Sequence, residues 1–187
     1  MMKAGAIDKG TCLLIKNEPY LVAEREFVNP GKGSAFVRVK LKNLMTGQVL
    51  KQVIKTQDSV EEILVEDRAC QYLYSDGDQF YFMDNETFEQ FSIPLEGFED
   101  KKFYMKEGDP YTLVMWEEKP IDIKIPYKME FVVTEAQDAI KGDTVTGATK
   151  TVKTETGLEV KVPIFIKEGE TILVNTESGD YVERVNT

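Results

Sequence analysis

The sequence predicts an all-β protein in which three small β-barrels follow one another along the chain. Alternation of apolar and polar residues is its dominant periodic signal, and short alternating segments recur between turns that contain glycine. No long helical pattern competes with this alternation. The 187 residues allow three units of roughly 60 residues, and a sheet that closes into a barrel has no exposed edge. Three such units in a row would form an elongated, straight or bent rod, and a compact cluster of barrels is the alternative.

The first barrel is predicted from four or five short strands. Its clearest strand covers residues 35–42, where the apolar residues at the odd positions face one way. Arg38, Lys40 and Lys42 face the other way, so this strand should be half buried and carry a cationic outer face. The other expected strands of this unit are 11–15, 20–27 and 48–55, with turns at 16–19 and 45–47.

A second group of strands begins near residue 61. The stretch 85–106 in its middle is less regular, and we expect one or two short helices there. The strands expected in this group are 68–75, 79–84, 111–116 and 121–125.

A third group completes the chain. The dipeptide Pro126-Tyr127 is the predicted joint before it, because proline cannot continue a central ladder. The predicted domains are therefore 1–63, 64–126 and 127–187. The strands expected in the third domain are 128–133, 150–154, 158–163, 171–175 and 181–185.

The net charge of −10 is divided unevenly along the chain. Residues 1–60 hold 10 basic and 5 acidic side chains, residues 61–126 hold 6 and 17, and residues 127–187 hold 7 and 11. Six basic residues and no acidic residue lie between positions 27 and 57. An acidic body opposes indiscriminate binding to polyanions, while the basic first third can meet phosphate where its shape fits. This asymmetry favours a factor that docks at a defined site.

Several classes of function are disfavoured by what the chain lacks. Histidine is absent, which excludes histidine-dependent triads, and Cys12 and Cys70 lie far apart in apolar segments where we expect reduced, structural thiols. The acidic residues are scattered through turns, so we expect no catalytic residues, no metal and no cofactor. No apolar run approaches the roughly 20 residues of a membrane span, and the first residues lack a signal-peptide core. We expect a cytoplasmic protein.

Lys32 stands between two glycines at the expected tip of a hairpin, inside the segment without acidic residues. Gly31 and Gly33 permit the positive φ values of a tight loop, and Pro30 fixes φ on the entering side. The ammonium should therefore be held away from the barrel beneath it, as an anion-binding probe. The alternative is an ordinary surface lysine at an exposed turn.

Four segments in three predicted domains carry a resemblance to one family. They are FVNPGKGSAFVRVKL at 27–41, DG at 76–77 with FMDNETFEQ at 82–90, KGDT at 141–144 with ATK at 148–150, and GLEVKVP at 157–163. In this order they resemble the bacterial translation elongation factor P family, a homologue of the eukaryotic and archaeal initiation factor five-A family. Two positions depart from the family pattern: Val152, where a smaller residue is usual, and Asn29, where many members have a basic residue.

The resemblance implies a KOW or SH3-like domain followed by two OB-type domains, in a shape like that of transfer RNA. It implies binding to both ribosomal subunits between the peptidyl and exit sites, with relief of stalling at consecutive prolines. Lys32 would reach the CCA end of the peptidyl-tRNA, often after extension by a lysine-modifying enzyme, and Gly142, Asp143 and Thr144 would lie near messenger RNA in the exit site. For the loop at 142–144, the alternative is an ordinary turn in which the Asp143 side chain hydrogen-bonds to its own backbone.

From the residues themselves, Arg38, Lys40 and Lys42 are expected to contact tRNA or rRNA phosphates, with ordinary strand polarity as the alternative. A monomer is expected, because the docking surface must stay free.

Two other classes compete with this prediction. A general RNA-binding OB-fold protein would need a basic groove with stacking aromatics over most of its length. The aromatic cluster of this chain lies in the acidic second third, and we interpret it mainly as core. An enzyme ranks third, since no convergent catalytic set is evident. The cluster comprises Tyr72, Tyr74, Phe80, Tyr81 and Phe82.

Overall fold

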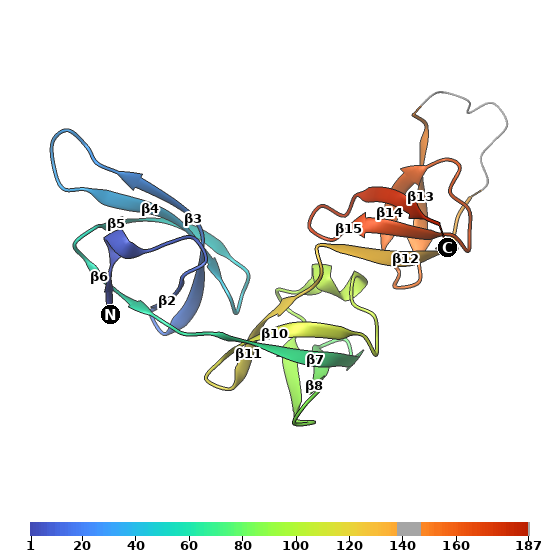
Figure 1. Cartoon of the computed structure of the whole chain (residues 1–187), viewed down its shortest axis with the longest axis horizontal. Helices are drawn as coiled ribbons and strands as arrows, with labels where there is room; N and C mark the ends of the chain where they lie inside the picture. The colour runs from blue at the N-terminus through green and yellow to red at the C-terminus, as the bar shows by residue number, and fades with distance from the viewer. Residues whose placement is uncertain (138–146, 187) are drawn as a thin grey trace.

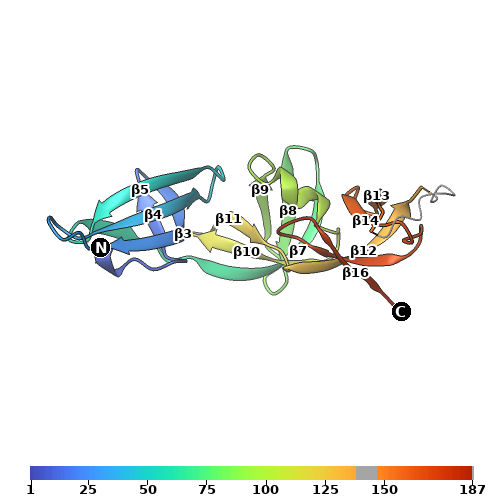
Figure 2. The ribbon, with the colours of Figure 1, turned by 90° about the horizontal axis from the view of Figure 1, so that it is seen from above.

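The computed structural model of the chain describes residues 1–137 and 147–186. Within these residues it contains three β-sheets, each with its own buried core, and two short 3-10 helices. Figure 1 shows the three units, called domains 1 to 3 in chain order, strung along a bent line with the chain ends in the outer two. Figure 2 shows the same units as an extended row. The predicted all-β class and elongated arrangement are confirmed.

Domain 1 is an antiparallel sheet with the strand order β1-β6-β2-β3-β4-β5. Its longest strands, β3 and β4, form the hairpin that projects from the sheet in Figure 1. Val37, Val39 and Leu41 on β4 are buried in the core, as the alternation predicts. The elements are β1 (Met2–Lys3), η1 (Ala4–Ala6), β2 (Cys12–Ile15), β3 (Glu18–Val28), β4 (Phe36–Asn43), β5 (Val49–Lys55) and β6 (Ser59–Glu62).

The expected closed barrel is only partly formed in domain 1. Across the described residues, the sheet order begins at β1 and ends at β5, without a ladder between them. The two-residue β1 is too short to supply such a ladder, and η1 packs there instead, with the Gly5 N–H donating to the Thr56 carbonyl (3.1 Å). The strand β5 consequently remains an edge strand.

The turn predicted at 16–19 is shorter in the structure. Only Lys16 and Asn17 lie between the strands, with φ of 50° and 64°, and β3 already begins at Glu18. Positive φ at both central residues is the geometry of a two-residue hairpin whose twist matches its strands. Pro19 is thus a strand residue, paired with Leu14.

Domain 2 has the strand order β11-β10-β7-β8-β9. One short helix, η2, lies in the stretch where helices were expected, but the same stretch also contains β9, which was not predicted. The elements are β7 (Glu66–Ser75), β8 (Gln79–Asp84), β9 (Gln90–Pro94), η2 (Glu99–Phe103), β10 (Pro110–Trp116) and β11 (Lys119–Lys124).

The aromatic cluster of domain 2 is divided between core and surface. Tyr72, Phe80 and Phe82 are buried, but Tyr74 is 50% exposed and stacks on Tyr81 at a centroid distance of 4.7 Å. The register of β7 against β8 shifts between Tyr72 and Tyr74, and such a bulge turns the following side chain to the other face. The cluster is thus mainly core, as interpreted, and Tyr74 is its exposed exception.

Domain 3 has the strand order β14-β13-β12-β15-β16. Val152, one of the two departures from the family pattern, is 1% exposed and belongs to the core, so its larger side chain is accommodated by packing. The strands are β12 (Lys128–Glu135), β13 (Thr149–Thr154), β14 (Glu159–Pro163), β15 (Thr171–Asn175) and β16 (Tyr181–Val185).

Both joints between domains are packed. Domains 1 and 2 share a buried apolar cluster to which Leu44 contributes from one side and Ile121 from the other, with Trp116 packed against it. Between domains 2 and 3, Lys106 forms an ion pair with Glu155 (2.9 Å). These contacts hold the three domains in one extended arrangement.

Candidate functional site

Lys32 is exposed in the loop at 29–35 that joins β3 to β4. From Glu24 to Phe27, β3 is exposed at every position, so this end of the hairpin stands clear of the core. Figure 1 shows the hairpin at the end of domain 1 that points away from domain 2. Within the described part of the chain, no ion pair holds the Lys32 ammonium. The predicted exposed position at a hairpin tip is confirmed.

The two glycines of the loop differ in their backbone conformation. Gly33 has φ of +104°, which a residue with a side chain rarely adopts, whereas Gly31 does not have a positive φ. No heavy atom lies within 4 Å of a Cβ placed at either position. The backbone conformation therefore requires glycine at position 33 but not at position 31. Gly31 leaves open space beside Lys32.

Arg38 and Lys40 project from the outer face of β4, but both are paired with carboxylates of β3. Arg38 Nη1 lies 3.3 Å from Glu26 Oε2, and Lys40 Nζ lies 3.0 Å from Glu24 Oε1. The hydrogen bond and charge of Lys40 lower the pKa of Glu24. These pairs are exposed and therefore weak, so phosphate can compete for the cations, although part of their charge is already balanced.

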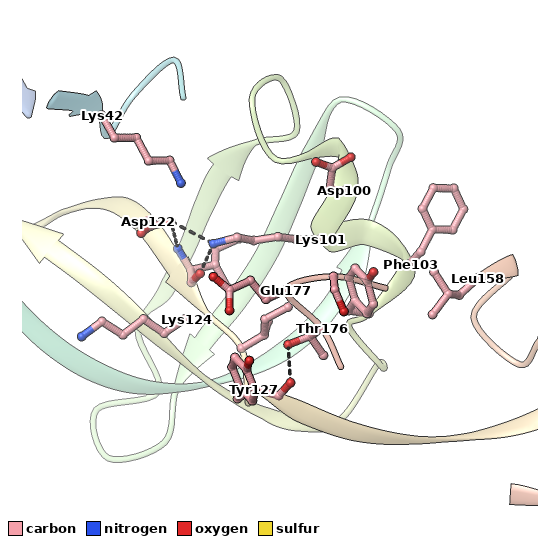
Figure 3. A pocket seen from close by; sticks show the side chains of 14 residues that line it. Lys42, Asp100, Lys101, Phe103, Asp122, Lys124, Tyr127, Leu158, Thr176 and Glu177 are labelled. Carbon is pink, nitrogen blue, oxygen red and sulfur yellow. Dashed lines mark hydrogen bonds and ion pairs between the residues drawn. The ribbon is translucent and has the colours of Figure 1, made fainter. Parts of the chain in front are cut away.

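Lys42, the third predicted contact, lies at the other end of the same face. It reaches a cavity of about 790 Å³ on the inner side of the bend, which residues of all three domains line. Figure 3 shows Lys42 pointing from domain 1 toward this cavity.

Two of the three lysines that line the cavity, Lys101 and Lys124, form ion pairs, with Asp122 and Asp67 respectively. The Lys101 Nζ donates to Asp122 Oδ1 (2.9 Å) and to the Ile123 carbonyl, as the dashed lines in Figure 3 mark. The Thr176 hydroxyl donates to the Pro126 carbonyl (2.6 Å) and so fixes the segment between domains 2 and 3. Lys42 has no ion pair with the described residues, and it is the cation that this cavity offers to a ligand.

Gly142, Asp143 and Thr144 lie outside the described residues. Residues 1–137 and 147–186 contain no group of three or more His, Cys, Asp or Glu side chains arranged to hold a metal ion. Nor do they include a helix with the length and hydropathy of a membrane span. Cys12 and Cys70 are free and buried, as expected, and burial raises the pKa of Cys70 to about 11.

Comparison with solved structures shows a protein with a similar fold. It is similar to the eukaryotic translation initiation factor 5A from Methanococcus jannaschii, with a TM-score of 0.53 and 24% identity over 66% of this chain and 90% of that one. Over these residues the two proteins share a fold.

Family models match nearly the whole chain. Residues 3–60 match the elongation factor P KOW-like domain, 65–123 the elongation factor P OB domain and 129–184 the elongation factor P C-terminal domain. The elongation factor P of Treponema denticola is 60% identical over 187 residues, and that of Treponema pallidum (strain Nichols) is 54% identical over 186 residues, each match covering 100% of both chains. That of Borrelia hermsii is 48% identical, covering 98% of this chain and 97% of the relative.

The chain belongs to the elongation factor P family, and it is a translation elongation factor. Its relatives are named for a translation factor rather than for a classical enzyme.

Proposed function

We propose that this factor binds the ribosome between the peptidyl and exit sites and stimulates peptide-bond formation where consecutive prolines slow it. Lys32 braces the CCA end of the peptidyl-tRNA. The observation that carries this proposal is the exposed ammonium of Lys32 at a hairpin tip that stands clear of the core. Membership of the elongation factor P family supports the same role.

The proposed effect of Lys32 is positional. Proline attacks through a secondary amine fixed in a ring, and consecutive prolines stiffen the nascent chain so that the acceptor carbonyl is misplaced. A cation that binds the sugar-phosphate backbone near the tRNA terminus restricts this motion and lowers the entropic part of the barrier. No proton transfer by the protein is involved.

The extended shape supports contact with both ribosomal subunits. Domain 1 would lie at the peptidyl-transferase side, with Arg38, Lys40 and Lys42 on tRNA or rRNA phosphates. Domain 3 would place Gly142, Asp143 and Thr144 near messenger RNA in the exit site. We propose that the factor acts as a cytoplasmic monomer without a bound cofactor, and that a lysine-modifying enzyme extends Lys32 covalently.

The test is synthesis across a proline run in reconstituted translation with Lys32→Ala, Lys32→Arg and a control variant, Lys9→Ala. We expect Lys32→Ala to abolish rescue while ribosome affinity and folding stay close to wild type, and Lys9→Ala to be fully active. Equal rescue by wild type and Lys32→Ala rejects the proposal. Full activity of Lys32→Arg would mean that charge suffices and lysine-specific modification is unnecessary.

Two further measurements separate the alternatives. Intact-protein mass spectrometry of native material, with fragmentation around Lys32, detects a covalent extension. Salt-sensitive binding to arbitrary single-stranded RNA, with no dependence on ribosome-bound tRNA, would instead favour a general RNA-binding protein.

A further inference from the structure

The same tight turn occurs in each of the three domains, between β4 and β5, between β8 and β9, and between β15 and β16. It begins at Asn43, Asp84 and Asn175 respectively. The side-chain oxygen of this first residue accepts the backbone N–H groups two and three positions further on. The N–H four positions further on donates to the carbonyl of the first residue in all three turns. The three turns therefore share one pattern of hydrogen bonds.

The fifth residue of this turn has a positive φ in every domain. It is Gly47 in domain 1 (φ 73°) and Gly179 in domain 3 (φ 78°), but it is Phe88 in domain 2 (φ 61°). Glycine adopts such values without a steric cost, whereas a bulky side chain is strained there. Phe88 is also 70% exposed, so burial in its own domain does not compensate for the strain.

Two of the three turns are docking elements within the molecule. The turn of domain 1 packs on domain 2, where a Cβ placed at Gly97 would lie 3.2 Å from the Thr46 carbonyl oxygen. The turn of domain 3 also packs on domain 2, because a Cβ placed at Gly179 would lie 3.2 Å from the Tyr104 hydroxyl oxygen. At both contacts a residue without a side chain allows two domains to approach closely.

The turn of domain 2 is not used in this way among the described residues. Residues 85–90 are all exposed, and the hydrogen bonds of this turn stay within domain 2. The exposed ring of Phe88 stands where the other two turns have glycine. Aromatic side chains are enriched in the cores of protein interfaces, since each buries a large apolar area. This turn therefore has the features of a docking element whose partner is another molecule.

The charges beside the ring select the class of that partner. Glu86, Glu89 and Glu118 line a hollow of about 440 Å³ next to the turn, and none of the three forms an ion pair with the described residues. Arg68, which also lines the hollow, is paired with Asp84 (3.6 Å). Unpaired carboxylates repel the phosphates of RNA and attract lysine and arginine side chains. The charges favour a protein partner over an RNA partner.

We infer that Phe88 is the anchor by which domain 2 docks on a protein of the ribosome. The partner surface offers an apolar socket for the ring, with lysine or arginine side chains at its rim that face Glu86 and Glu89. This inference rests on the proposed function, which places the factor on the ribosome, and it adds a second contact surface that is independent of Lys32.

The experiment measures binding of the full-length factor to ribosomes that carry peptidyl-tRNA, together with the thermal unfolding of each variant. The test variant is Phe88→Gly, which gives this turn the residue that the other two turns have. Phe88→Tyr keeps an aromatic ring. Leu64→Ala is the control, because Leu64 is 87% exposed and its replacement removes an apolar side chain elsewhere on the surface.

We expect Phe88→Gly to bind about tenfold more weakly, as the loss of an interface anchor predicts, while its unfolding midpoint stays at or above that of wild type because the strained φ is relieved. Phe88→Tyr and Leu64→Ala should bind within about twofold of wild type. If Phe88→Gly binds as tightly as Leu64→Ala, the ring is not an anchor and the inference is overturned.

A charge variant, Glu86→Gln with Glu89→Gln, separates a protein partner from RNA. We expect binding about threefold weaker at 0.1 M salt, because the cations at the rim lose their partners, and a smaller difference at higher salt. Tighter binding would mean that phosphates face the carboxylates and would overturn the inference. A benzophenone-bearing residue in place of Phe88 should crosslink to a ribosomal protein, and crosslinks to RNA alone would overturn it as well.

The same measurements distinguish this failure from a failure of the proposed function. If Lys32→Ala abolishes rescue but Phe88→Gly binds like wild type, only the docking through Phe88 is wrong. If the wild-type factor does not bind ribosomes that carry peptidyl-tRNA, both are wrong.

Discussion

Lys106 links domain 2 to domain 3 through three contacts, and its loss should loosen that joint. Its Nζ lies 2.9 Å from Glu155 Oε1 and 2.5 Å from the Glu130 carbonyl oxygen, and 5.0 Å from the centroid of the Phe131 ring. All three partners belong to domain 3. We predict that Lys106→Met weakens the docking of domain 3 on domain 2.

The magnitude follows from the exposure of the groups. The side chains of Lys106 and Glu155 are 26% and 36% exposed, so solvent screens the pair and its contribution is at most about 1 kcal/mol. The hydrogen bond to a carbonyl adds about 1 kcal/mol, and the contact with the ring adds about 0.5 to 1 kcal/mol. Lys106→Met should therefore reduce the free energy of docking of domain 3 on domain 2 by roughly 1.5 to 3 kcal/mol.

A double-mutant cycle with Glu155→Gln isolates the ion pair from the other two contacts. We expect a coupling energy of about 0.5 to 1 kcal/mol in urea denaturation at pH 7 and low salt, falling in 1 M salt. A coupling energy indistinguishable from zero at low salt would refute the account of this joint.

The coupling should also depend on pH. Burial acts to raise the pKa of Glu155, but the hydrogen bonds from Lys106 and the Val132 N–H, with the charge of Lys106, lower it overall from its ordinary 4.5. A carboxyl with a lowered pKa in the folded state stabilises the fold above its unfolded pKa, and this contribution is lost as the pH falls through the folded value. The coupling should thus be complete at pH 7 and disappear only once the pH has fallen below the lowered pKa of Glu155 in the folded protein. An unchanged coupling in acid would mean that the pair is not ionic.

Three further perturbations test other parts of the account. Gly33→Ala places a side chain at φ +104°, which costs about 1 to 3 kcal/mol of local strain. Rescue of proline-run synthesis through Lys32 should therefore fall several-fold, while Gly31→Ala remains active. Equal rescue by the two variants would contradict this. Ile121→Asp puts a charge into the cluster between domains 1 and 2, so the fluorescence of the single tryptophan, Trp116, should shift to the red, and an unshifted spectrum would count against a packed joint. Cys70 is buried with a pKa of about 11, so its alkylation at pH 8 should be at least tenfold slower in the native protein than in urea; equal rates would show that it is accessible.

The strands could be predicted where apolar and polar residues alternate over many consecutive positions. The alternation of β4 fixes which residues are buried, and the structure buries Val37, Val39 and Leu41 as that alternation requires. The short strands β6 and β9 were missed because four or five residues, Ser59–Glu62 and Gln90–Pro94, carry too little alternation to be distinguished from a loop. The exposure of Tyr74 depends on a bulge, which leaves no periodic signal in the sequence.

The position of Lys32 could be predicted because the glycines and the proline beside it define a turn. The pairing of Arg38 and Lys40 could not be predicted from a count of charges, because Glu24 and Glu26 lie just upstream of the segment without acidic residues. Their alternate spacing on β3 is the signal that could have revealed it, since antiparallel register brings them opposite the cations of β4.

The sequence does not reveal which residues make contacts between domains. The Lys106–Glu155 pair joins residues of domains 2 and 3, and its formation depends on how these two folded domains are oriented relative to each other. Single charged residues in polar loops carry no pattern that would identify such partners.

The most direct test of the central claim is photo-crosslinking from position 32. A benzophenone-bearing residue replaces Lys32, or Lys9 as a control, and each protein is irradiated on ribosomes that carry peptidyl-tRNA. We predict that crosslinks from position 32 map to the terminal nucleotides of the peptidyl-tRNA and that position 9 gives none there. Crosslinks from position 32 that never reach those nucleotides, while the factor is bound, would contradict the claim that this side chain holds the tRNA end.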